Sequence, residues 1–238
     1  MNLILLNRGD FIADDIVRLA GRRHDHIVSV LRARPGDTLK VGLLNGPVGS
    51  GQIQQLDRSV VFLKIQLNQT PPEPLPVTLI LALPRPKVLK RLLQGLCAMG
   101  IKDIVLYSSW RVDKSYWQSP LLQPDALAAQ AWLGLEQGRD TRMPTIRQFR
   151  RFRPFVEDHF PEIVAGKSAW VAHPGLGLTC PANVPGSNAL VIGPEGGFTQ
   201  YELEQFIRAG CAPVKLGERP LRVEQAVPAL LGRLIAFP

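Results

Sequence analysis

Four prolines within residues 71–76, PPEPLP, divide the chain into two parts. Proline lacks a backbone N–H and fixes its own φ angle, so this run can form neither a helix nor a central strand. It does form a short, stiff spacer. Because the apolar patterns differ on its two sides, we expect a small domain at 1–70, a linker at 71–76 and a larger domain at 77–238.

Short apolar or alternating runs separated by turns fill residues 1–70, which is typical of a small β domain. One stretch differs, because residues 24–31 place Ile27, Val30 and Leu31 on one helical face. His24 and His26 have no further His or Cys at ligand spacing, so we expect packing roles and no metal. The expected strands are 3–6, 38–43, 51–56 and 60–67.

From Val77 onward, strand-like runs alternate with helical stretches, which predicts an α/β fold with a mostly parallel sheet covered on both faces. A proline inside a helix costs about 3 kcal/mol. The last helix is therefore expected either to run from Pro228 to Phe237 or to be kinked at Pro228. The expected strands are 77–83, 103–108, 169–172, 189–192 and 213–216, and the other expected helices are 87–99, 125–136, 147–160 and one that follows Thr199.

Residues 189–202, ALVIGPEGGFTQYE, predict a strand, a glycine-rich loop and a helix. Gly196 and Gly197 can take positive φ angles, and Thr199 and Glu202 have the spacing of a capping box. This arrangement commonly builds a small-molecule site at the carboxyl edge of a sheet. Glu195 in the middle of the loop would repel phosphate, which favours a cationic or amine-bearing ligand.

Three loops follow three successive late strands, at 172–175, 193–197 and 216–222. In a parallel sheet all three emerge at one carboxyl edge, so we expect them to line one pocket. The loops lack the central serine of a nucleophile elbow and the G-x-G-x-x-G dinucleotide fingerprint. No Ser-His-Asp set is evident in the sequence, and the four histidines do not group.

The net charge of +8 and the pI near 9.8 indicate an anionic partner, with nucleic acid ahead of membrane. Residues 139–153 hold six arginines and one aspartate, although a basic run is also commonly only a solvated face. No apolar run approaches a bilayer span and no signal peptide is evident, so we expect a cytoplasmic protein. The spacing of Cys97, Cys180 and Cys211 indicates reduced structural thiols.

Four segments in order carry a resemblance to a known family. Residues 192–199, IGPEGGFT, and 216–226, LGERPLRVEQA, resemble the two C-terminal motifs of the RsmE family. The segment 26–37 looks like that family's barrel-domain motif. Glu136-Gln137 with Arg139, Arg142 and Pro144 is similar to its central motif.

The resemblance implies a knotted methyltransferase of the SPOUT class with an N-terminal PUA-like barrel, acting as a homodimer. It implies S-adenosylmethionine as the cofactor and N3 of a uridine in 16S rRNA of the small ribosomal subunit as the target. The matching cofactor-binding positions are Ala172, His173, Gly193, Pro194, Glu195, Gly196, Gly197, Leu216, Gly217 and Leu221. The arginines expected to contact RNA are Arg22, Arg23, Arg32, Arg34, Arg139 and Arg142.

For catalysis we hypothesise that Arg222 stabilises the developing uracil anion or an adjacent phosphate, and that Glu224 orients it or helps take the proton. Alternatively, the two residues form a structural ion pair or cap the last helix. The chain departs from the family at Val223 and Gln225, where threonines are usual, and at Gly95 and Ala98, where the family has a lysine and a glutamate.

Two other functions remain open at the level of sequence. The first is an RNA chaperone or ribosome-assembly factor on the same scaffold that transfers no methyl group. The second is an enzyme of the same class with another target, such as a ribose 2′-hydroxyl of tRNA. The retained loop at 193–197 and Arg222 favour the enzyme, whereas the missing threonines slightly favour the binding protein.

Overall fold

The chain, whose computed structural model describes residues 2–236, divides into two compact units. The first unit contains the residues up to Glu73 together with Ala131–Met143, and the second contains Pro74–Gln130 and the residues from Pro144 onward. The division at Glu73 and Pro74 falls inside the proline run. Residues 131–143, which the sequence patterns placed with the larger domain, fold instead with the smaller one.

The first unit is built on a six-stranded mixed sheet of order β1-β4-β5-β6-β3-β2. Only β1 and β4 pair in parallel, and the other neighbours are antiparallel. The apolar side chains of these strands form one core around Leu6, Leu19 and Leu63, as expected of a barrel-like domain. The strands are β1 (Ile4–Leu6), β2 (Phe11–Ala13), β3 (Ile16–Ala20), β4 (Thr38–Leu43), β5 (Val48–Leu56) and β6 (Val60–Gln69), of which β2 and β3 were not expected.

The helical stretch near residue 24 does not have the expected face. Helix α1 (Arg22–Asp25) passes directly into a wider π-helical turn at His26–Val30. Because that turn changes the side-chain spacing, Ile27 is buried while Val30 and Leu31 are 64% and 42% exposed. The expectation of one apolar face was wrong here.

His24 and Glu136 are buried polar residues that hold the first unit together. His24 Nε2 lies 2.9 Å from the Asp57 carbonyl, and this hydrogen bond, with that to Asp25, raises the pKa of His24. The Glu136 carboxylate forms an ion pair with Arg22 at 2.8 Å. The backbone carbonyl of Glu136 accepts the N–H groups of Asn2 and Leu3. These bonds fasten residues 131–143 to α1 and to the residues just before β1, so the Glu136-Gln137 segment has a structural role. No His, Cys, Asp and Glu group within residues 2–236 could hold a metal ion.

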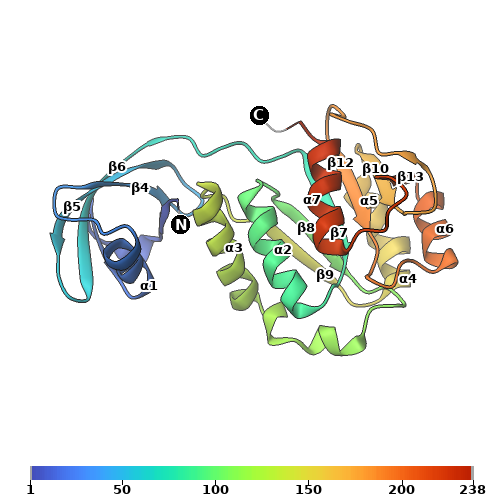
Figure 1. Cartoon of the computed structure of the whole chain (residues 1–238), viewed down its shortest axis with the longest axis horizontal. Coiled ribbons are helices and arrows are strands. Elements are labelled where there is room, and N and C mark those ends of the chain that lie inside the picture. The colour runs from blue at the N-terminus through green and yellow to red at the C-terminus, as the bar shows by residue number, and fades with distance from the viewer. Residues whose placement is uncertain (1, 237–238) are drawn as a thin grey trace. The chain divides into compact units, whose positions relative to one another are not determined.

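The second unit contains a seven-stranded sheet of order β11-β13-β10-β12-β7-β8-β9 (Figure 1). Every neighbouring pair is parallel. This confirms the expected α/β fold. The strands are β7 (Val77–Ala82), β8 (Asp103–Tyr107), β9 (Thr145–Phe149), β10 (Ser168–Ala172), β11 (Leu178–Thr179), β12 (Asn188–Ile192) and β13 (Ala212–Lys215).

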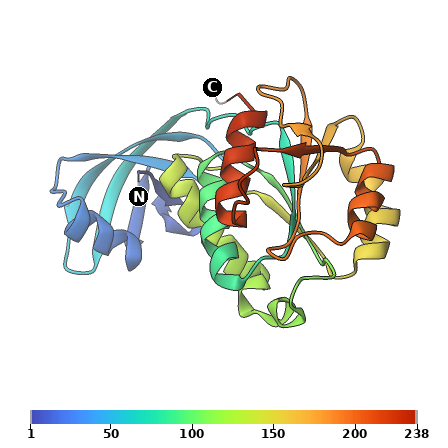
Figure 2. The same cartoon turned by 45° about the vertical axis from the view of Figure 1, so that its right-hand side comes forward.

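Helices cover both faces of this sheet, as Figure 2 shows with the sheet seen nearly edge-on. Helices α2 (Pro86–Ala98) and α7 (Val223–Leu234) lie on one face. Helices α4 (Phe152–Pro154), α5 (Phe160–Val164) and α6 (Gln200–Arg208) lie on the other. Helix α3 (Pro124–Gly138) runs from the second unit into the first. No helix within residues 2–236 is both long and apolar enough to cross a membrane.

One expectation for this unit was wrong, and of the two alternatives for the last helix the start at Pro228 is excluded. Residues 145–149 form strand β9 and not the start of a helix, because they pair in register with β8 and Arg147 forms a 2.7 Å ion pair with Asp103. Helix α7 begins at Val223 and contains Pro228. Pro228 lies on the exposed side of α7, where water can satisfy the carbonyl that loses its partner, while Val227 and Leu231 on the other side are fully buried. The expected end at Phe237 lies outside the described residues.

Strand β12 lies in the middle of the sheet, and all five of its residues are buried. The Tyr107 hydroxyl donates to the Ile192 carbonyl at 3.2 Å, at the point where β12 ends. Burial raises the pKa of Tyr107 well above its ordinary value, so the hydroxyl keeps its proton. Stacked and edge-on rings surround it, among them Phe155 and Phe206. The loop after β12 therefore starts from a fixed position.

Glu202 joins that loop to the loop after β8. It completes the expected capping box of α6, accepting the Thr199 N–H and hydroxyl at 2.9 Å each. Its other carboxylate oxygen accepts the Trp110 N–H at 2.7 Å. Only 2% of Glu202 is exposed, and a buried carboxylate is stabilised by such donors and by the positive end of a helix.

Replacing Glu202 by Ala should destabilise the second unit by about 2–4 kcal/mol, because it leaves several partly buried donors without an acceptor. Chemical denaturation measures this. The matched control is Glu204→Ala, since the Glu204 side chain is 46% exposed and its only ion pair within residues 2–236 is the 3.9 Å contact with Arg208. Equal stability of the two variants would contradict the role given to Glu202.

Candidate functional site

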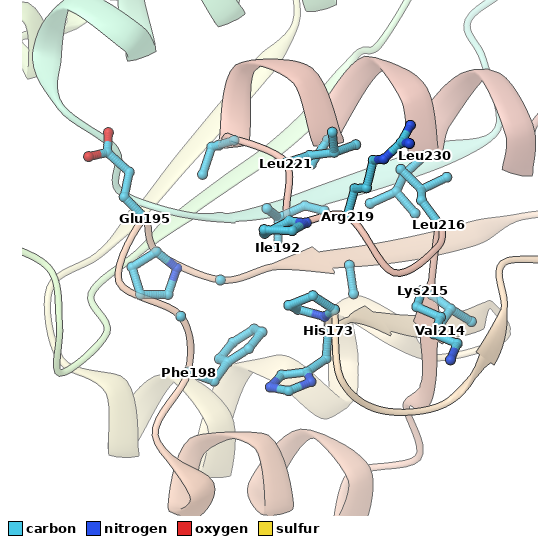
Figure 3. Close-up of a pocket in the computed structure, with 18 of the residues that line it drawn as sticks. His173, Ile192, Glu195, Phe198, Val214, Lys215, Leu216, Arg219, Leu221 and Leu230 are labelled. Carbon is cyan, nitrogen blue, oxygen red and sulfur yellow. The ribbon is translucent and has the colours of Figure 1, made fainter.

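A pocket of about 330 Å³ opens at the carboxyl ends of β10, β12 and β13 (Figure 3). It combines the three loops that the sequence patterns grouped, together with the first turns of α7. Its walls are mostly apolar. The residues that line it are Arg111, Ala172, His173, Pro174, Ile192, Gly193, Pro194, Glu195, Gly197, Phe198, Val214, Lys215, Leu216, Gly217, Arg219, Pro220, Leu221, Val223, Ala226 and Leu230.

Two glycines shape the loop after β12, each for a different reason. Gly197 has a φ of +75°, a conformation that side chains with a Cβ rarely adopt. A Cβ at Gly193 would stand 2.8 Å from the ring of Phe198, which is nearly buried and packs edge-on against Phe206. The φ angle of Gly196 is not positive. The expected left-handed conformation is therefore found at Gly197 and not at Gly196.

Two arginines from other segments of the second unit, one at the start of α2 and one in the loop after β8, hold the same loop. Arg85 Nε lies 2.9 Å from the Glu195 carboxylate, and Arg111 donates to the Gly196 carbonyl at 2.7 Å. A hydrogen bond to Tyr116 and then the charge of Glu195 raise the pKa of Arg85, and the charge of Glu224 adds to this. The loop is therefore anchored on its side-chain face by α2 and on its backbone by the loop after β8.

These contacts change how the charge of Glu195 should be interpreted. Its carboxylate is neutralised by Arg85, and the pocket lining includes Arg111, Lys215 and Arg219. The sequence argument that Glu195 disfavours phosphate did not include this pairing, because nothing in the spacing connects Glu195 to Arg85. The pocket offers both signs of charge, so it suits a ligand that carries a carboxylate as well as positive groups.

His173 is fixed at the pocket wall by its own loop. Its Nδ1 accepts the Gly175 N–H at 3.1 Å, and its backbone N–H bonds to the Val214 carbonyl at 2.9 Å. The second bond ties the loop after β10 to β13. Figure 3 shows Leu216, Leu221 and Leu230 on the opposite side of the cavity from Phe198. An apolar slot therefore lies between loops that are linked by hydrogen bonds.

Residues 71–235 match the family described as the RNA methyltransferase domain. The chain belongs to the RNA methyltransferase domain family. The matched residues include every segment that lines the pocket, and they begin inside the proline run.

Similar proteins and structures extend over nearly the whole chain. A ribosomal RNA small subunit methyltransferase E from Treponema pallidum is 28% identical, covering 99% of this chain and 91% of the relative. One from Borreliella burgdorferi is 24% identical, covering 95% and 94%. The crystal structure of such an enzyme from Neisseria gonorrhoeae bound to S-adenosyl methionine has a TM-score of 0.75 at 21% identity, covering 97% of each chain. A methyltransferase from Legionella pneumophila in complex with the cofactor SAM has the same TM-score at 24% identity, covering 97% and 95%.

The pocket of this RNA methyltransferase domain contains the expected ligand-binding residues with one exception. Nine of the ten positions line it, and the tenth, Gly196, accepts a hydrogen bond from Arg111, which does line the pocket. The patterns missed Arg111, which lies 85 residues before Gly196 and has no sequence signal of its own. Arg219 and Phe198 lie inside the recognised motifs and could have been included.

Arg222 and Glu224 do not line the pocket, although Val223 between them does. Arg222 is the N-cap residue of α7, and its side chain is exposed. The two form no ion pair in the described part of the chain. Glu224 instead lies close enough to Arg85 to affect its pKa. Arg222 therefore caps the last helix through its backbone carbonyl, which accepts the N–H groups of Gln225 and Ala226, and its side chain is exposed.

The six arginines expected to contact RNA all lie in the first unit, and they differ in availability. Arg23 forms two 2.6 Å hydrogen bonds with Asp10 and is only 16% exposed, so its guanidinium is held in a structural contact and its assignment to RNA stays a prediction. Arg142 makes a paired contact with Glu73, which raises the pKa of Arg142. Arg22 pairs with Glu136 but is half exposed. The remaining exposed arginines are Arg32, Arg34 and Arg139.

Replacing Gly193 by Ala should lower the stability of the protein by about 1–3 kcal/mol, because the added methyl overlaps the Phe198 ring. Thermal unfolding measures the loss. Gly95→Ala is the control, since a Cβ at Gly95 meets nothing within 4 Å and alanine favours the helix. A Gly193→Ala protein as stable as the wild type would show that the ring moves aside freely.

Proposed function

We propose that this protein is an S-adenosylmethionine-dependent methyltransferase that methylates N3 of a uridine in 16S ribosomal RNA. The observation that carries the proposal is the joining of three separate loops around one pocket in an RNA methyltransferase domain. The relatives named as ribosomal RNA small subunit methyltransferase E, which match along nearly the whole chain, support the choice of substrate.

The pocket fits the cofactor in size and in chemistry. Its volume of about 330 Å³ lies within the range of small-molecule sites, roughly 300–1,000 Å³. Leu216, Leu221 and Leu230 offer an apolar wall for the adenine, and the loop at 193–197 brings backbone close to the ligand. Arg111, Lys215 and Arg219 can pair with its carboxylate, and Glu195 can attract its positive groups.

The chemical step makes modest demands on the protein. When bound, the cofactor supplies a methyl group on a good leaving group, the sulfonium. The N3–methyl bond forms as the sulfur–methyl bond breaks, and the imide proton must leave N3. The protein must therefore hold N3 in line with the methyl group and provide a proton acceptor. Because N3 lies on the pairing edge, the base has to be unpaired or flipped out.

Within this reaction we assign Arg222 to the developing negative charge on the uracil or to an adjacent phosphate. Its exposed guanidinium is next in sequence to Val223, which lines the pocket. Glu224, on the first turn of α7 near Arg85, would orient these arginines or take the proton.

The first unit would contribute the remaining contact with RNA. Arg32, Arg34 and Arg139 are exposed there, whereas the charges of Arg22 and Arg142 are balanced by Glu136 and Glu73. The protein's net charge of +8 supports binding to a polyanion. We further propose that the enzyme acts as a homodimer on rRNA or the small subunit in the cytoplasm.

The test is to incubate the protein with methyl-labelled S-adenosylmethionine and either assembled small subunits or free rRNA, and to map the modified nucleotide. We expect label at N3 of one uridine of 16S rRNA. Binding of RNA and cofactor without any transfer would instead identify an assembly factor, and label on a ribose of tRNA would identify a different target.

Glu195→Gln should weaken binding of S-adenosylmethionine about two- to fivefold, the effect expected from losing an exposed ion pair worth about 0.2–1 kcal/mol. The loop then loses its tie to Arg85, while turnover at saturating cofactor should change less than twofold. Calorimetry and steady-state kinetics separate the two quantities. Glu204→Gln, which alters an acid outside the pocket, is the control. A large drop in turnover with normal affinity would give Glu195 a part in the chemical step.

Arg222→Gln should lower turnover about 100-fold, the usual effect of removing one group that stabilises transition-state charge. Cofactor affinity should stay the same, because the Arg222 side chain does not line the pocket. Arg208→Gln on α6 is the matched control. If turnover by Arg222→Gln is unchanged, Arg222 has only its capping role.

A further inference from the structure

The second unit carries arginines and aromatic rings along the carboxyl edge of β7, β8 and β9, beside the pocket. Strand order places these three strands directly after β12, so the segments that follow them are neighbours of the loop at 193–197. Each segment exposes at least one arginine. We call this set the edge surface: Arg85, Trp110, Arg111, Tyr116, Trp117 and Arg150.

Trp110 is the most exposed large apolar side chain of the described residues, at 85%. The other three tryptophans are partly buried and donate their indole N–H, to Ser108, Glu136 and Asn188 respectively. Within residues 2–236, the ring of Trp110 makes no such hydrogen bond and no contact with another ring. The edge surface therefore presents one whole aromatic face to solvent.

The backbone that presents this ring is fixed. The Trp110 N–H bonds at 2.7 Å to Glu202, which is buried. The next residue, Arg111, bonds to Gly196 in the pocket loop at 2.7 Å. Because hydrogen bonds already hold the backbone here, stacking a base on the Trp110 ring would cost little further conformational entropy. Trp110 also directly precedes Arg111, which lines the pocket.

The charge around the ring favours a polyanion. Arg85, Arg111 and Arg150 are all exposed, and Arg150 lies over the Trp117 ring at 5.7 Å. Proteins that bind single-stranded nucleic acid combine stacking rings with a basic surface in this way. A second protein chain would not need three arginines at this place, which makes RNA the better-matched occupant.

We propose that the edge surface holds single-stranded RNA, with one base stacked on Trp110 and the phosphates near Arg85 and Arg150. This rests on the proposed function in that it places an unpaired strand next to the methyl-transfer pocket. It adds a contact that none of the arginines of the first unit provides. Stacking a base here would also hold the strand open, as access to N3 of a paired uridine requires.

Binding of a short fluorescent oligouridylate, followed by anisotropy, tests the proposal without any methyl transfer. Trp110→Ala should weaken binding about 10-fold, the loss expected from one stacked base, and Trp110→Phe should restore it to within about threefold. Leu178→Ala is the matched control, because Leu178 is 83% exposed but lies on β11, away from these strands. The affinity for S-adenosylmethionine should stay the same in all three variants.

Three results would overturn the proposal. They are equal oligouridylate binding by Trp110→Ala and wild type, failure of Trp110→Phe to restore it, and a change of oligomeric state in Trp110→Ala by sedimentation. The last would show that a second protein chain covers the ring. If the wild type shows Trp110-dependent binding but methylates no RNA, the edge surface stands and the proposed function fails. If the wild type methylates 16S rRNA but Trp110→Ala binds oligouridylate normally, the proposed function stands and the edge-surface proposal fails.

Discussion

The parallel pairing of β12 with β10 on one side and β7 on the other is the constraint on which the rest of the structure depends. All five residues of β12 are buried, so the strand cannot shift without exposing them. Its end is fixed further by Tyr107, whose protonated hydroxyl holds the last carbonyl of the strand. From this position the loop at 193–197 meets the loops after β10 and β13, and the pocket forms where the three meet.

Charged side chains from segments distant in sequence then hold the pocket loop in place. Arg85 and Arg111 hold one loop through a side chain and a carbonyl, and buried Glu202 joins the same loop to Trp110. These contacts make one rigid edge out of the ends of β7, β8 and β12. The contacts that hold the pocket loop thus also fix the backbone of Trp110 and Arg111, whose side chains are exposed.

The sequence predicted the elements whose signals are local. The alternating strands and helices of the second unit, the capping box of Thr199 and Glu202 and the grouping of the three loops follow from periodicity, spacing and the rules of parallel sheets. The failures have long-range causes. Residues 131–143 join the first unit through Glu136, whose carbonyl accepts the N–H groups of Asn2 and Leu3 just before β1. Pro228 is accepted inside α7 because the opposite face is buried. The contact between Arg23 and Asp10 is likewise long-range and could not be recognised from spacing.

The central claim is that one cofactor binds between the three loops of the second unit. A crystal structure of the protein with S-adenosylhomocysteine, the stable product of the cofactor, tests this most directly. The account predicts the ligand between Phe198 and the leucines at 216, 221 and 230, with the Arg85–Glu195 pair intact beside it. Ligand density elsewhere on the protein, or an empty pocket at saturating ligand, would contradict the account.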